Sequence, residues 1–409
     1  MAGLRGVHST GDPDLAARGA RARTGLIVSF RASFMGYDIE GPDFVAPNQA
    51  WAVQRAHDFD LLVAHEGVYD AYIDAMTDQT QNPDFRGVAV YINMMHHKKP
   101  PGVAGGVDPS WYVRYLTGPD VGEPVVVHDL WVMNPREQGW IDHQIDLLHD
   151  RLASSGYPTA YIDGGGLGPW VPNMRDPATD AEWTKADWLK DMKPIWSRVR
   201  DDPEIGVPAW ANNLGSPQDF YDDNAQLMLR STPEWFRQLF SENYLRGATE
   251  PITAYPTAAE YDAYKSMVAD CHGRLTAMTK LWATGTPTQA EKDRWHAYAL
   301  ATYMATGRPG TAFYCTYVRA GESASPNPTA FHPWWGVAKS LGEATDQEYG
   351  DHIRKRQFTN GMVAVNITND QRGFTPNPAV PHVSHDGMSH AAGAPITMPP
   401  KTGLLLLHV

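Results

Sequence analysis

The sequence predicts an α/β fold, a (β/α)8 TIM barrel followed by a small C-terminal antiparallel β domain. Short apolar and β-branched runs alternate with longer helical patterns over most of the chain, as repeated βα units around a parallel sheet require. After about residue 349 this alternation gives way to hairpin and loop patterns. A chain of 409 residues also suits one barrel with one accessory module. We therefore expect an N-terminal extension over residues 1–23, a barrel over 24–348 and a β domain over 349–409.

Nine strand-like runs compete for the eight places in the barrel. They cover residues 26–30, 61–64, 88–92, 124–128, 159–162, 207–211, 238–240, 280–283 and 311–315. Helical patterns between them cover residues 138–154, 185–200, 260–278 and 289–306. Which run lies outside the barrel is left open. If 26–30 is an added strand, the count that we favour, 159–162 becomes strand four and 238–240 becomes strand six.

The last sixty residues predict the small antiparallel sheet. Residues 356–366 have the pattern of a hairpin with Asn360-Gly361 as its two-residue turn. Residues 373–395 are rich in Pro, Gly and His and predict a loop. The run Leu404-Leu405-Leu406-Leu407 predicts a final buried strand.

Charge and cysteine content exclude several classes of function. The formal net charge is −13 and no run of five basic residues occurs, so we expect neither nucleic acid nor a membrane surface as a partner. Cys271 and Cys315 form no CxxC pattern, which argues against a zinc ribbon or a redox motif. The first 23 residues lack the apolar core of a secretory signal, and no run of 18 apolar residues occurs. We therefore expect synthesis in the cytoplasm without a signal peptide and without membrane insertion.

Polar side chains follow most of the expected strands. They are Glu66, Asn93, Asp129, Asp163, Asn212, Asn213, Glu242 and Asn243. Functional groups of (β/α)8 barrels lie where the strands end and the following loops begin. We therefore expect these side chains to line an acidic cleft.

Asp163 and Glu242 are the two candidate catalytic residues. Asp163 ends an apolar run and precedes three glycines, although an Asx-turn would explain it as well. Glu242 also ends an apolar run, although a salt bridge to Arg246 is the plainer alternative. Glycoside hydrolysis needs two such carboxyl groups on either side of one bond. We expect Asp163 to be the nucleophile and Glu242 the acid/base, with a pKa raised by the neighbouring Phe240 and Tyr244.

The remaining polar and aromatic residues near strand ends are candidates for binding a sugar. Amides both donate and accept hydrogen bonds, which suits hydroxyl groups, and aromatic faces can stack on sugar rings. We expect the polar contacts to come from Glu66, Asn93, Asp129, Asn212, Asn213 and Asn243. We expect one stacking platform among Trp131, Trp170 and Trp210.

Neither a metal ion nor a cofactor is expected. His382, His385 and His390 lie near Asp386, but their spacing in an expected loop specifies little about a metal site. The sequence contains no HExxH motif, P-loop, GxGxxG motif after a strand, or GxSxG motif.

The chain resembles a poorly characterised family of glycosyl-hydrolase-like barrels. The resemblance rests on Tyr161-Ile162-Asp163-Gly164 at strand four and Phe240-Ser241-Glu242-Asn243 near strand six. It also rests on Arg356-Gln357-Phe358-Thr359-Asn360-Gly361, which leads into residues 363–366, and on Pro399-Pro400-Lys401-Thr402-Gly403. It covers the chain from about residue 24 to the end.

The resemblance implies a glycosidase that acts on a polysaccharide or a cell-surface glycan. Such barrels occur in secreted bacterial enzymes and in minor tail proteins of phages that infect actinobacteria. The apparent lack of a signal peptide favours the second setting. There the protein would belong to the virion, contact other phage tail proteins and act on a host surface or cell-wall polysaccharide.

Two other functions stay open at this stage. The first is a non-catalytic virion structural or receptor-binding protein that keeps the barrel as a carbohydrate-binding platform, since one fold serves many functions. The second is a metal-dependent carbohydrate deacetylase, which would need clustered His and Asp ligands in one cleft.

Overall fold

We describe the fold from a computed structural model of the chain. It describes residues 31, 33–35, 60–64, 88–127, 129–155, 159–164, 168–169, 171–203, 205, 210–221, 238–247, 250–281, 284–316 and 333–409. The expected strand 26–30 and the candidate residues Glu66 and Trp170 lie outside this part of the chain.

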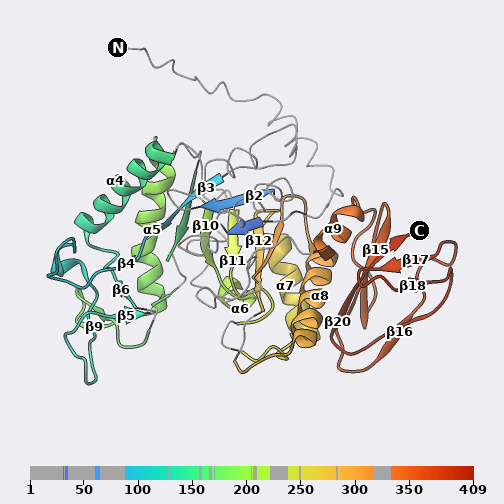
Figure 1. The fold of residues 1–409 in the computed structure, drawn as a ribbon. Coiled ribbons are helices and arrows are strands. Elements are labelled where there is room, and N and C mark those ends of the chain that lie inside the picture. Colours follow the sequence, from blue (N-terminus) through green and yellow to red (C-terminus); the bar gives the residue numbers. More distant parts are fainter. Residues whose placement is uncertain are drawn as a thin grey trace, which may run out of the picture.

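Eight parallel strands form the central sheet (Figure 1). In spatial order they are β1 (Ser33–Met35), β2 (Leu61–Ala64), β3 (Val88–Asn93), β7 (Thr159–Asp163), β10 (Trp210–Leu214), β11 (Gln238–Ser241), β12 (Leu275–Lys280) and β13 (Ala312–Thr316). The backbone N–H of Phe313 in β13 donates to the carbonyl of Arg31, just before β1, at 2.9 Å. This bond joins the first and last strands, so the sheet closes and the predicted barrel is confirmed.

Helices cover the barrel between its strands. They are α4 (Gln138–Ser155), α5 (Lys185–Asp201), α6 (Pro217–Tyr221), α7 (Ala258–Asp270), α8 (Gln289–Thr306) and α9 (Pro333–Ser340), with a short 3-10 helix, η4, over Pro109–Trp111. Thr257 and Glu260 form a capping box at the start of α7, and Thr288 and Glu291 form one at the start of α8. Each box satisfies backbone donors that the first helical turn leaves open.

The expected helix over 260–278 is too long. Helix α7 ends at Asp270, and Leu275 begins β12. His272 and Gly273 between them have positive φ angles of 50° and 78°, which a right-handed helix does not allow. A Cβ atom on Gly273 would lie 1.9 Å from the carbonyl oxygen of Pro309, so this turn requires glycine. The expected strand 280–283 therefore shares only Lys280 with β12.

The run 124–128, strand three in the favoured count, does not belong to the barrel. Its β5 (Val126–Val127) pairs antiparallel with β6 (Leu130–Val132), which pairs with β4 (His96–His97) in a separate three-stranded sheet. A second small hairpin pairs β8 (Arg175–Asp176) with β9 (Ala181–Glu182). Because β1 takes the first place in the barrel, 159–162 and 238–240 still fall at positions four and six.

The predicted antiparallel β domain is confirmed as a five-stranded sheet. Its strands, in spatial order, are β14 (Ile353–Phe358), β15 (Gly361–Asn366), β20 (Thr402–His408), β17 (His382–Ser384) and β18 (Ser389–His390). Strands β16 (Arg372–Phe374) and β19 (Ile396–Met398) form a separate two-stranded sheet. The segment 373–395, expected to be a loop, thus contains short strands. The bounds of the domains themselves stay predictions.

The hairpin turn lies one residue earlier than expected. Phe358 pairs with Gly361, so Thr359 and Asn360 form the turn. Gly361 belongs to β15, where a Cβ atom would lie 2.0 Å from the carbonyl oxygen of Leu406. Gly361 is therefore required for the close approach to Leu406 and not for the turn.

The β domain lies beside the barrel on the side of α8 and α9, while α4 and α5 cover the opposite side (Figure 1). Helix α8 packs against both β15 and β20, and every residue from Trp295 to Thr306 is buried. The two parts therefore share a core.

Candidate active site

The barrel interior has an aromatic layer beneath a polar layer. The ring centroids of Tyr91 and Tyr161 are 5.8 Å apart, those of Tyr161 and Phe240 4.8 Å, and those of Trp210 and Phe240 6.1 Å. Alternate residues of a strand share a face. Two residues after each aromatic side chain, the strand or the turn that follows it therefore carries a polar residue on the same side: Asn93, Asp163, Asn212 and Glu242.

Asp163 ends β7 and accepts three hydrogen bonds. Its Oδ2 accepts from the hydroxyl of Tyr91 at 2.8 Å. Its Oδ1 accepts from the backbone N–H of Gly164 at 2.8 Å and from the Asn212 amide at 3.0 Å. Neighbours on both sides of β7 thus fix the orientation of this carboxyl group.

Glu242 follows β11 directly and lies between an amide and a cation. Its Oε2 accepts from Asn212 at 2.9 Å, and its Oε1 accepts from the ammonium of Lys280 at 2.5 Å. The Lys280 side chain is 10% exposed and that of Glu242 is 38% exposed. The ion pair that the structure gives Glu242 is with Lys280 and not with Arg246, the alternative considered from sequence. The Arg246 guanidinium donates to the carbonyls of Gly247, Glu250 and Lys280.

One nitrogen atom connects the two acids. Because Nδ2 of Asn212 lies 3.0 Å from Oδ1 of Asp163 and 2.9 Å from Oε2 of Glu242, these oxygens lie no more than 5.9 Å apart. The two hydrogens of a planar amide diverge by roughly 120°, which places the two oxygens about 5 Å apart.

A tight turn after β7 brings the backbone close to β3. Gly164 has φ +75°, and a Cβ atom there would lie 2.5 Å from Oδ1 of Asn93. That oxygen also accepts from the backbone N–H groups of Met95 and His96. Asn93 thus shapes the turns beside Asp163, a structural role that the sequence analysis did not anticipate.

Burial and the nearby charge of Glu242 raise the pKa of Asp163 above its ordinary value. Its hydrogen bonds from Tyr91, Gly164 and Asn212 act in the opposite direction but do not cancel this effect. Burial, followed by the charge of Asp163, also raises the pKa of Tyr91, so its hydroxyl stays protonated and donates. The sequence had predicted a raised pKa at Glu242; the acid for which burial raises the pKa in the structure is Asp163.

Four other candidate residues lie at different places in the structure. Asp129 is exposed in the turn between β5 and β6, away from the barrel strands. Trp131 is half-buried in that same small sheet. Trp210 is completely buried and packs on Phe240, so its ring has no face open to a sugar. Asn213 lies in β10, where the backbone register with β11 shifts.

Lys280 and Tyr91 are site residues that the sequence analysis missed. Lys280 is the last residue of β12, where functional groups of such barrels lie. It was missed because the expected strand 280–283 made it the first residue of a strand. Tyr91 lies inside β3, two residues before Asn93 and on the same face of the strand. The period of two in an inward-facing strand could have identified it.

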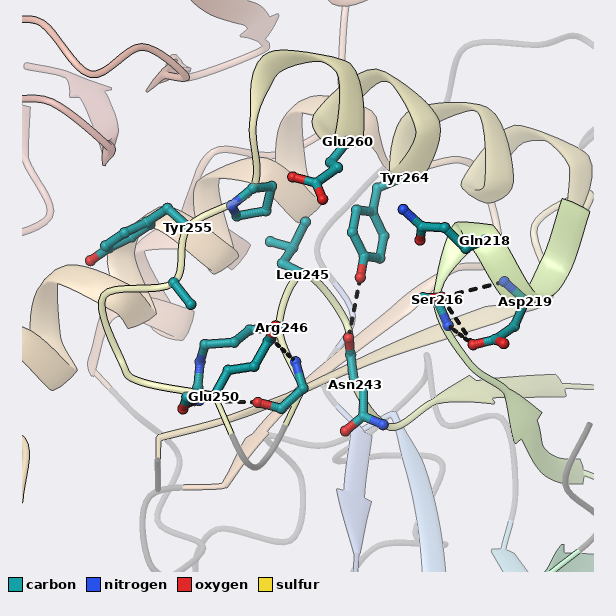
Figure 2. Close-up of a pocket in the computed structure, with 13 residues that line it drawn as sticks. Ser216, Gln218, Asp219, Asn243, Leu245, Arg246, Glu250, Tyr255, Glu260 and Tyr264 are labelled. Atoms are coloured by element: carbon teal, nitrogen blue, oxygen red, sulfur yellow. Dashed lines mark hydrogen bonds between the residues drawn. The ribbon is translucent and has the colours of Figure 1, made fainter. Parts of the chain in front are cut away.

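A side cavity of about 510 Å³ lies next to the strand ends, between α6, α7 and the turn after β11 (Figure 2). Asn243 lines it and accepts a hydrogen bond from Tyr264 through its backbone carbonyl. The three acids of the cavity have structural partners: Asp219 accepts from Ser216, Glu250 accepts from the backbone N–H of Gly247, and Glu260 belongs to the capping box of α7. Their hydrogen bonds therefore explain their positions without a ligand.

Within the described part of the chain, no three His, Cys, Asp or Glu side chains are grouped so that they could hold a metal ion. In the same part of the chain, none of the helices has the length and apolar character needed to cross a bilayer.

Several solved structures have a fold similar to that of this chain. A family 39 glycoside hydrolase from Bacteroides cellulosilyticus WH2 is similar with a TM-score of 0.54 and 10% identity, over 93% of this chain and 81% of that one. Trehalulose synthase MutB is similar with a TM-score of 0.52 and 12% identity, over 93% of this chain and 99% of that one. The chain has a TIM-barrel fold like that of these structures. At these identities the likeness concerns the fold alone.

Other comparisons are less informative. The chain spans about half the length, 55% and 56%, of two similar α-galactosidases, from Lactobacillus brevis and Geobacillus stearothermophilus. No protein-family model matches the sequence, and no curated protein matches it.

Proposed function

We propose that the protein is a retaining glycoside hydrolase in which Asp163 and Glu242 are the two catalytic carboxyl groups. The observation that carries this proposal is the Asn212 amide, which donates to both acids at 3.0 and 2.9 Å. The resulting separation of about 5 Å suits the roughly 5–5.5 Å of retaining enzymes. It is shorter than the roughly 6.5–9.5 Å that inverting enzymes need to admit a water molecule. The glycoside-hydrolase-type barrel supports the same conclusion.

The site contains the groups that a retaining reaction needs. One carboxylate attacks the anomeric carbon while the other carboxyl group protonates the departing oxygen. Water then cleaves the glycosyl ester as the second group takes back a proton. Asn212 would hold the two acids at the required distance, and Tyr91 would orient Asp163.

The substrate and setting rest on the sequence resemblance. We propose that the substrate is a host surface or cell-wall polysaccharide and that the protein is a minor tail protein at a phage tail tip. Carboxylates and amides at the strand ends suit sugar hydroxyls. Mass spectrometry of purified virions should detect the chain together with other tail proteins; its consistent absence from virions would remove this setting.

The test of the activity is hydrolysis of a panel of actinobacterial cell-wall polysaccharides, measured as new reducing ends. The wild type should release sugar, while Asp163→Asn and Glu242→Gln should each reduce kcat by about 10³-fold or more. Asp351→Asn and Glu123→Gln are matched controls, because both side chains are exposed and both residues lie outside the barrel strands. Proton NMR of the first product should show the anomeric configuration of the substrate.

Three results would contradict the proposal. Full activity of either acid variant would remove that acid from the mechanism. A product of inverted configuration would contradict the retaining assignment. Glycan binding by a wild type that hydrolyses nothing, and binding that survives loss of both acids, would favour the non-catalytic carbohydrate-binding protein.

A further inference from the structure

The two acids differ in the cation beside them. The ammonium of Lys280 lies 2.5 Å from Oε1 of Glu242. Asp163 forms no ion pair with any Lys, Arg or His of the described residues, and its donors are the uncharged groups of Tyr91, Gly164 and Asn212. The site is thus asymmetric in charge, although the two carboxyl groups share one amide donor.

This asymmetry decides where a single negative charge is most stable. Two carboxylates about 5 Å apart in a partly buried site repel each other, so one of them tends to keep a proton. A cation in contact with one acid favours the charged form of that acid, and the proton stays on the other. The raised pKa of Asp163 agrees with this distribution.

Lys280 is also well placed to fix the position of Glu242. It is the last residue of β12, and its side chain is only 10% exposed. Its backbone carbonyl accepts from the buried guanidinium of Arg246. A cation anchored in this way holds the neighbouring carboxylate in one orientation.

We propose that Lys280 is a positioning residue that keeps Glu242 ionised as the nucleophile and leaves Asp163 as the proton donor. This inference rests on the proposed glycosidase function and reverses the roles that the sequence analysis expected. In the first step, Glu242 forms a bond to the anomeric carbon, the glycosidic C–O bond breaks, and the proton of Asp163 moves to the leaving oxygen. In the second step, Asp163 takes a proton from water, whose oxygen displaces Glu242 and regenerates its carboxylate.

The first experiment needs no substrate. Carbon-13 NMR of labelled Asp and Glu carboxyl groups, with signals assigned through Asp163→Asn and Glu242→Gln, follows both acids through a pH titration. Asp163 should keep its proton to higher pH than Glu242 in the wild type and in Lys280→Arg. In Lys280→Met this order should weaken or reverse. A wild type in which Glu242 keeps its proton to the higher pH would overturn the inference, whatever the outcome of the hydrolysis screen.

The second experiment assigns the roles on the glycan that the wild type hydrolyses. With added azide, a Glu242→Ala variant should yield a glycosyl azide of inverted configuration, because azide replaces the nucleophile. An Asp163→Ala variant should yield a glycosyl azide of retained configuration, formed from the glycosyl enzyme. The opposite pair of products would refute the assignment while leaving the glycosidase function intact.

The pH profile separates a positioning role from a merely structural one. Lys280→Met should lower kcat by about 10²-fold and move the acidic limb of the profile to higher pH, since Glu242 loses the cation that keeps it ionised. Lys280→Arg should restore much of the activity and the acidic limb. A loss of activity in Lys280→Met with an unmoved acidic limb would contradict the proposal.

Discussion

At the scale of single residues, the hydroxyl group of Tyr91 bears on the protonation of Asp163. It donates to Oδ2 at 2.8 Å, and a donor to a carboxylate favours the ionised form. Tyr91→Phe removes this donor, so the pKa of Asp163 should rise further. If Asp163 is the proton donor, the basic limb of the pH–activity profile should move to higher pH by about one unit.

The matched control for this prediction is Tyr349→Phe. The hydroxyl of Tyr349 also forms a hydrogen bond, here as the acceptor from Gln357, but the ring is exposed and lies in the C-terminal part of the chain. This variant should leave the profile unchanged. A basic limb that moves to lower pH in Tyr91→Phe would argue against Asp163 as the acid.

The two candidate acids and Asn212 were predicted from sequence, whereas the contacts of Tyr91 and Lys280 with the acids were not. Asp163 and Glu242 end apolar runs, and that pattern is local. Tyr91 and Lys280 act through contacts across 72 and 38 positions of the chain, which depend on strand neighbours and register. Trp210 is a residue type that can stack on a sugar, but its side chain points into the core and is completely buried.

At the scale of elements, strand β17 forms the middle of a row of histidines. His382 pairs with His390 of β18 and with His408 of β20. It is 1% exposed, and within the described residues neither of its ring nitrogens has a hydrogen-bond partner. Burial, then His408 and His390, lower the pKa of His382 below its ordinary value of about 6.5.

This row should make the protein less stable in acid. The folded pKa of His382 is lower than the unfolded pKa, so the unfolded chain binds the proton more tightly. The contribution of the neutral His382 to the free energy of unfolding is therefore fully present above about pH 6.5, and it is lost as the pH drops below that value. His382→Leu should show a smaller fall in melting temperature between pH 7 and pH 5 than the wild type. The exposed His352→Leu is the control, and equal pH dependence in both variants would remove the row as the cause.

Element boundaries were predicted less well than the elements. A β-branched run at 124–128 specifies a strand but not the sheet that it joins, and the hairpin with β6 takes it out of the barrel. Helical periodicity continues past Asp270, and only the packing of Gly273 against Pro309 shows why the chain must turn there. Such contacts between distant residues cannot be derived from local patterns.

At the scale of the whole molecule, the fold class could be predicted because it follows from the repeated alternation of strands and helices, which needs no single correct boundary. The contact between the barrel and the β domain could not. Helix α8 is buried from Trp295 to Thr306, and its sequence gives no sign of which sheet covers its outer side.

Gly403 of β20 tests this contact. A Cβ atom there would lie 2.1 Å from the carbonyl oxygen of Ala297 and 2.6 Å from Cβ of Ala301, both in α8. At this contact the backbone of β20 therefore lies directly against α8. Gly403→Val should lower the free energy of unfolding by about 3 kcal/mol, at the upper end of the range for overpacking. Gly373→Val is the control, because its Cβ would meet only the carbonyl oxygen of Ile396 at 3.7 Å. Urea denaturation measures the free energy of unfolding of both variants. Equal stability of the two variants would mean that the sheet can move away from α8 at little cost, and that the barrel does not depend on the β domain for the burial of this helix.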